Sequence, residues 1–194
     1  MTRVSAEEPG TDTPTRTGPA ASAPTAKQLD RVRIWLNKNT PTGTNSAERL
    51  EKLHVLQAAC EQVAPTDFTA WSSCWFFDRM KMKGLEAKKP ALGYLRKAVS
   101  QAIAEIKKTK VSKGVVAWYL YNMGYVFKTP DACFAIDIFA PEADSLATSL
   151  DFLLVSHWHG DHTSLPLMDA MLKARKPVLT RHYKGSTLVQ TNSE

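Results

Sequence analysis

The chain has 194 residues, of which 43% are hydrophobic, and its formal net charge is +6 at pH 7. This length accommodates one ordinary domain with an appendage, and the hydrophobic fraction excludes a wholly disordered chain. No apolar run approaches the roughly 20 residues that a membrane-spanning helix needs, and the polar N-terminus lacks the apolar core of a signal peptide. Three cysteines without a C-x-x-C spacing favour a reducing, cytoplasmic setting in which they are small buried hydrophobes.

The first 26 residues, Met1–Ala26, consist mainly of Thr, Pro, Ala, Ser and Gly. A segment with almost no large apolar residue cannot bury enough surface to offset the entropy lost on ordering. The composition predicts a disordered tail.

Residues 27–112 are predicted to form a helical N-terminal region. Apolar residues recur at helical spacing over 27–37 and again after a turn-rich break. Asn45 followed by Glu48 resembles a capping box and predicts the start of the second helix, which Pro65 ends.

An aromatic segment follows this second helix. Its members are Phe68, Trp71, Trp75, Phe76 and Phe77. Such a cluster can line a pocket or stack on nucleic-acid bases. More often it is the core of a small helical unit, and we favour that interpretation here.

Residues 79–113 are strongly basic, with eleven Lys or Arg residues against two Glu. An apolar stripe within this stretch predicts a helix over 93–108. The charge has two explanations, a surface that binds nucleic acid or anionic lipid, or a solvated helix face. We favour the solvated face, because no nucleic-acid-binding motif accompanies the charge.

After residue 112 the chain changes character, because β-branched and aromatic residues take over. Strands are predicted at Val115–Asn122, Tyr125–Lys128 and Ala132–Ile138, separated by turn residues. Asp137 stands near the end of the third strand. A domain boundary is therefore expected at 112–114, followed by a second domain over residues 113–194.

The most informative stretch is Asp151–Leu165, which reads DFLLVSHWHGDHTSL. A short apolar run, typical of a buried strand, leads into three of the five histidines of the chain and an aspartate. His157 and His159 are two positions apart, so an extended backbone points both imidazoles the same way. Asp161 and His162 follow where the chain turns, and can approach the same point from another side. Imidazoles with a carboxylate suit zinc or a similar divalent metal.

A helix is predicted after this cluster, with Thr163 or Ser164 as its N-cap and Pro166 in its first turn. Pro177 stops it, and Val178 begins another strand. Residues 181–194 lose all periodicity and are interpreted as a tail. The sheet would keep one exposed face, which is typical of a fold that lacks a partner layer.

The sequence His157-Trp158-His159-Gly160-Asp161-His162 resembles the His-x-His-x-Asp-His signature of the metallo-β-lactamase-fold hydrolases. The order of predicted elements, with an aspartate ending the third strand, is similar to the N-terminal half of that family, and the SHWHGDH wording favours its lactonase-like branch. The resemblance implies an α/β fold, namely half of an αββα sandwich, over residues 113–194.

The resemblance also implies a metal-dependent hydrolase. His157 and His159 would hold one metal, Asp161 and His162 a second, with zinc expected and iron or manganese as alternatives. Metal-bound hydroxide would attack an ester, lactone, amide or phosphoryl group of a small-molecule substrate, and Asp161 would orient the attacking water. Asp137 would orient a ligand histidine from behind, or would be an ordinary strand-end residue.

The family's later ligands cannot be matched in this sequence, because the only histidine after His162 is His182, which follows too soon. The missing ligands would come from a C-terminal half or from a second subunit. The alternatives are a truncated, non-catalytic fragment of such an enzyme and a basic nucleic-acid-binding protein.

Overall fold

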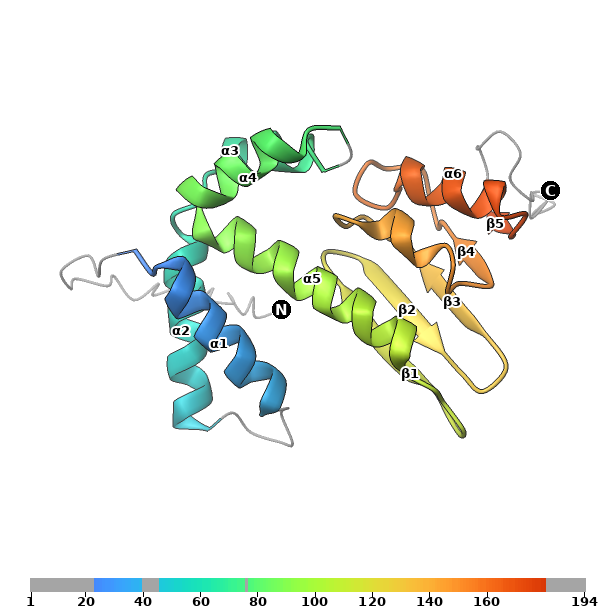
Figure 1. Cartoon of the computed structure of the whole chain (residues 1–194), viewed down its shortest axis with the longest axis horizontal. Helices are drawn as coiled ribbons and strands as arrows, with labels where there is room; N and C mark the ends of the chain where they lie inside the picture. The colour runs from blue at the N-terminus through green and yellow to red at the C-terminus, as the bar shows by residue number, and fades with distance from the viewer. Residues whose placement is uncertain (1–22, 40–45, 76, 181–194) are drawn as a thin grey trace, which may run out of the picture.

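A computed structural model describes residues 23–39, 46–75 and 77–180 of the chain. These residues form a mixed α/β structure in which four helices precede a long fifth helix and a five-stranded sheet (Figure 1). The predicted tails, apart from residues 23–26, lie outside the described residues, as do Asn45, Phe76 and His182. In the described part of the chain, no helix is long and apolar enough to cross a membrane.

The first two helices begin at side-chain caps. Thr25 and Gln28 form a reciprocal capping box for α1 (Ala26–Lys38), which starts one residue earlier than predicted. Helix α2 (Ala47–Cys60) is capped by Ser46, whose hydroxyl accepts a hydrogen bond from the Arg49 amide. The prediction of Asn45 as this cap was therefore wrong by one residue, since the neighbouring Ser46 satisfies the free amide instead.

Helices α3 (Pro65–Ser72) and α4 (Arg79–Lys88) enclose the predicted aromatic cluster. Trp71 and Trp75 are buried and meet edge to face, with ring centroids 5.0 Å apart. Phe68 packs at 5.7 Å from Trp71, whereas Phe77 is 87% exposed. The aromatic segment is thus mainly a local core, as its composition favoured, and Phe77 is the exception.

Helix α5 (Pro90–Lys108) joins the helical region, defined here as α1–α4, to the sheet (Figure 1). It starts three residues before the predicted helix because Pro90 occupies the first turn, where a missing N–H costs no hydrogen bond. Leu92 packs into the aromatic core, while Val99, Ile103 and Ile106 belong to the core of the sheet. One amphipathic helix therefore contributes to both cores.

The sheet has the strand order β1-β2-β3-β4-β5. An antiparallel meander comes first, formed by β1 (Val116–Leu120), β2 (Gly124–Lys128) and β3 (Cys133–Ile136). Strands β4 (Phe152–Leu154) and β5 (Val178–Leu179) then continue in parallel with β3. The sequence order matches the spatial order, as expected when each connection is short or passes through one crossover.

Helices cover one face of this sheet. The 3-10 helix η1 (Ala143–Leu146) lies in the β3–β4 crossover, and α6 (Leu165–Lys173) lies in the β4–β5 crossover. Together with α5 they bury the alternate strand residues that point to this side, including Leu120, Val126 and Leu153. This period-2 burial is what one helix-covered sheet face requires.

The opposite face carries a row of aromatic rings, one after another across four strands. The row, called the aromatic ladder below, consists of Tyr119, Tyr125, Phe127, Phe134 and Phe152. Successive ring centroids are 5.1, 5.9, 5.3 and 4.8 Å apart. Tyr119 and Tyr125 remain 60% and 42% exposed. None of the described elements packs as a layer over this face.

Candidate metal centre

Strand β4 delivers the His-rich segment to one edge of the sheet. Val155 is still buried, and its amide donates to Leu179 O at 2.9 Å, so the chain stays in register with β5 until the motif begins. Residues 156–163, called the motif loop below, then leave the sheet, and the Ser164 hydroxyl caps α6. The carboxyl ends of parallel strands are where α/β proteins place ligands, and the loop opens there.

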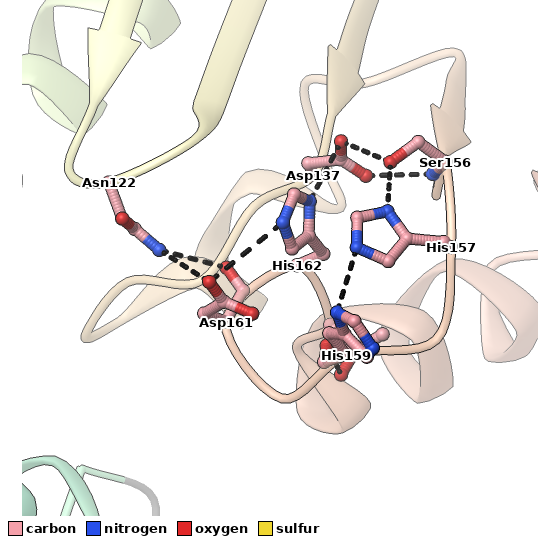
Figure 2. A network of polar contacts seen from close by, with 8 residues as sticks. Asn122, Asp137, Ser156, His157, His159, Asp161 and His162 are labelled. Carbon is pink, nitrogen blue, oxygen red and sulfur yellow. Dashed lines mark hydrogen bonds and ion pairs between the residues drawn. The ribbon is translucent and has the colours of Figure 1, made fainter.

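The motif loop brings the three imidazoles together (Figure 2). His157 Nε2 lies 3.0 Å from His159 Nδ1, and their ring centroids are 4.5 Å apart. The ring of His162 lies 4.0 Å from that of His157. His157 and His159 are exposed, whereas the side chain of His162 is only 12% exposed. The three predicted ligands therefore form one cluster with an open side.

Asp137 lies behind this cluster, just after β3. Its side chain is nearly buried, and its two oxygens accept hydrogen bonds from the Ser156 amide at 2.8 Å and the Ser156 hydroxyl at 2.6 Å. Its backbone has a φ of +52°, a conformation that Asp adopts more readily than most residues. The turn at the end of β3 thus aims a carboxylate at the base of the motif loop.

The contact with Ser156 determines which nitrogen of His157 carries a proton. The Ser156 hydroxyl donates to Asp137, so its oxygen is left to accept from His157 Nδ1, which is 2.9 Å away. His157 Nδ1 then holds the proton, and Nε2 presents a lone pair toward His159. A lone pair on the exposed side of the ring is what metal ligation needs.

His162 approaches the same carboxylate directly. Its Nδ1 is 3.1 Å from Asp137 Oδ2, but the two groups are poorly aligned for a hydrogen bond, so this buried nitrogen lacks a well-formed partner. A rotation of the imidazole would complete the hydrogen bond from Nδ1. The other ring nitrogen, Nε2, would then be available to bind a metal. Asp137 is therefore placed to orient His162 as well as Ser156.

Asp161 stands on the exposed side of the cluster. Asn122, from the turn between β1 and β2, donates to its Oδ2 at 3.2 Å, and His162 Nε2 is 3.8 Å from the same oxygen. The Asn122 hydrogen bond is the main reason why the pKa of Asp161 lies below its usual value. The carboxylate is therefore charged at neutral pH, as a metal ligand or water-orienting group must be.

Sequence reasoning did not identify Asn122 or Ser156. Asn122 was assigned to the end of the first strand, but β1 ends at Leu120 because Tyr121 and Asn122 have φ values of +43° and +56°. An Asn followed two residues later by Gly is a turn signal that could have located it. Its partner Asp161 is 39 positions away in the sequence, so no local sequence pattern could predict that contact.

The helical region packs against the turn between β1 and β2. Tyr121 stacks on Phe68 at 5.6 Å and meets Trp75 edge to face at 6.1 Å. Trp75 also packs against Phe139 at 4.8 Å. The aromatic core of the helices is thus in contact with two segments, at Tyr121 and Phe139, that border the candidate centre.

Within the described residues, no three His, Cys, Asp or Glu side chains already share a metal position. The imidazoles instead contact one another, His157 with both His159 and His162. Two nitrogens that bind one tetrahedral zinc at 2.0–2.1 Å are roughly 3.3 Å apart, and the His157–His159 pair is at 3.0 Å. The donor types of this pair suit zinc, whereas the two nitrogens point at each other, so the imidazoles would have to rotate before both could bind one ion.

The basic stretch is partly engaged within the molecule. Arg96 pairs with Glu86 at 2.8 Å, Lys97 with Asp30 at 2.5 Å, and Lys89 with Asp67 at 3.0 Å. The carboxylate of Glu86 is 9% exposed and also accepts from the Trp71 indole. These ion pairs connect helices to one another. Part of the positive charge of residues 79–113 therefore has a structural role.

Comparison with known proteins yields no relative. No protein-family model matches the chain, and no curated protein or solved structure matches it either.

Proposed function

We propose that this chain carries the first half of the metal site of a metallo-β-lactamase-fold hydrolase, which acts on an ester, lactone, amide or phosphoryl substrate. One observation carries the proposal. Three imidazoles and a carboxylate converge at the carboxyl end of β4, with His157 Nε2 and His159 Nδ1 3.0 Å apart. Two of the three histidines, His157 and His159, are exposed, so packing in a core does not account for them.

The surrounding fold supports the proposal. A sheet covered by helices on one face, with a ladder of aromatic rings on the other, is what half of an αββα sandwich would look like. An aspartate at the end of β3 contacts the histidine loop from behind, as the resemblance implies for Asp137.

In this proposal each residue has a defined task. His157 and His159 would hold one metal, while Asp161 and His162 would hold a second. Asp137 keeps the imidazoles oriented, through Ser156 and through His162 Nδ1. A zinc ion at this position would supply an activated water at neutral pH. Asp161, restrained by Asn122, would orient that water toward the substrate.

The number of ligands sets a requirement. A catalytic zinc takes three protein ligands and keeps one open position, whereas each pair here supplies two. The proposal therefore requires further ligands from outside the described residues, in the form of a second polypeptide or a continuation of the chain.

Zinc-dependent hydrolysis tests the proposal. The chain, purified without chelator, is assayed with and without zinc on activated esters, a lactone and a phosphodiester. Where dimerisation supplies the further ligands, we expect turnover that a chelator abolishes and that is lost in His157→Ala/His159→Ala. His54→Ala is the matched control, because His54 is an exposed histidine on α2. Zinc binding without turnover would indicate a non-catalytic fragment, and activity that survives the double substitution would refute the assignment.

A further inference from the structure

A cleft of about 350 Å³ lies between the helical region and the motif loop. Its lining residues come from α3 and the loop after it, from the segment after β3, and from the motif loop with the start of α6: Thr69, Ser72, Ser73, Phe77, Phe139, Gly160, Thr163, Leu165 and Pro166. The volume is within the usual range of ligand-binding pockets. We propose that this apolar cleft binds an uncharged aryl or medium-length alkyl group of the substrate.

The lining has the chemistry for such a group. None of the residues that line the cleft is charged. Phe77 is 87% exposed and Leu165 is 48% exposed, so both present apolar surface to an incoming group. Three hydroxyl-bearing residues of α3 and its C-terminal end border them. Burying apolar surface of a ligand here is favourable, whereas a charged group would lose water without gaining a partner.

The cleft adjoins the candidate metal centre through the motif loop. Gly160 lines the cleft and stands between His159 and Asp161 in the sequence. A Cβ at Gly160 would meet open space, so the backbone there borders free volume. Thr163, also in the lining, donates from its hydroxyl to His159 O at 3.0 Å. A substrate bound at the candidate metal centre would therefore have the cleft beside it for its remaining part.

The opposite wall is held by aromatic packing. Trp75 is 4% exposed and lies 4.8 Å from Phe139, which itself lines the cleft. This contact fixes α3 and its following loop against the segment after β3. The helical region thus contributes a wall of the cleft, which assigns to it a role in substrate selection.

The identification of the ligand as a substrate rests on the proposed function. Binding of an apolar group to the cleft can be tested without any metal. The probe is 4-fluorophenylacetamide, an uncharged aryl compound, titrated into the metal-free full chain and followed by ¹⁹F NMR. We expect Phe77→Ala and Ser73→Phe each to weaken binding about five- to tenfold, since one removes apolar contact and the other fills the cleft. Met80→Ala is the matched control, because Met80 is 85% exposed and does not line the cleft.

Equal affinity in all four proteins, or no binding to the wild type, would overturn the proposal. Phe77 and Ser73 are exposed and lie outside both cores, and the far-UV circular dichroism of each variant checks directly that it is folded.

A second measurement addresses the substrate class. With zinc present, 4-nitrophenyl acetate, butyrate and hexanoate are compared, and we expect kcat/KM to rise about three- to fourfold per added methylene until the cleft is filled. Ser73→Phe should remove this rise, whereas the Met80→Ala control should retain it. If kcat/KM of the wild type does not rise with the length of the acyl chain, the cleft does not bind this part of the substrate. Absence of all hydrolysis would refute the proposed function alone, and the binding titration would then decide on the cleft.

Discussion

Asp137 contacts two parts of the motif loop, Ser156 directly through both oxygens and His162 at 3.1 Å. Removing its charge should therefore disturb the imidazoles without disturbing the fold. Asp137→Asn retains the shape and tolerates the φ of +52°. We expect zinc affinity to fall about 10- to 100-fold, the usual cost of losing the group that orients a ligand histidine.

A competition titration with a chromophoric zinc chelator measures this affinity. Asp131→Asn, at an exposed aspartate in the turn before β3, is the matched control. If the two variants bind zinc equally well, Asp137 does not orient the ligands.

Asn122 is expected to control the ionisation of Asp161. Since the Asn122 hydrogen bond is the largest cause that lowers the pKa of Asp161, its removal should raise this pKa toward the ordinary aspartate value. Asn122→Gly is the suitable change, because glycine adopts the φ of +56° without strain. A ¹³C NMR titration of the metal-free chain follows the Asp161 carboxyl group, and an unchanged pKa would show that the contact does not form in solution.

At the scale of elements, the aromatic ladder connects four strands of the sheet. Phe134 occupies its middle, with Phe127 at 5.3 Å on one side and Phe152 at 4.8 Å on the other. Tyr119 stands at its end, has one ring neighbour in the ladder and is 60% exposed. The two positions therefore test whether contacts across strands stabilise the sheet.

We expect Phe134→Ala to lower the free energy of unfolding by about 1–2 kcal/mol, less than for a fully buried Phe because this ring is half-buried. Tyr119→Ala should cost a few tenths to about 1 kcal/mol. Urea denaturation measures both. Equal losses would mean that the ladder contributes no cross-strand stabilisation beyond ordinary burial.

The elements of the α/β part could be predicted from sequence because their patterns are local. Runs of β-branched and aromatic residues bounded by turn residues predicted β1, β2 and β3, and the apolar run before His157 predicted β4. Element ends were less accurate. β1 ends two residues earlier than predicted because Tyr121 and Asn122 adopt positive φ in the turn that follows it.

At the scale of the whole molecule, the helical region and the sheet share side chains. Leu95 and Tyr121 pack against both the aromatic core and the core of the sheet. This coupling predicts one cooperative unfolding transition in which the far-UV circular dichroism changes together with the tryptophan fluorescence, to which Trp71 and Trp75 of the aromatic core and Trp118 of the sheet contribute. Two separated transitions would show that the helices fold independently of the sheet.

This coupling could not be predicted from the sequence. The change in composition after residue 112 marked a boundary, but α5, which lies before it, packs on the sheet through Val99, Ile103 and Ile106. The apolar cleft also depends on contacts between distant segments, such as Trp75 with Phe139. The candidate ligands could be found because they are adjacent in sequence, whereas the residues that orient them and the walls around them are assembled by the fold.

Metal stoichiometry tests the central claim most directly. The full chain is purified without chelator, and its zinc, iron and manganese content is measured by mass spectrometry beside His157→Ala/His159→Ala and the His54→Ala control. We expect about one or two equivalents of metal in the wild type and the control, and a loss of metal in the double variant. Wild-type protein with no metal above background, or a double variant that retains its metal, would contradict a metal centre at the end of β4.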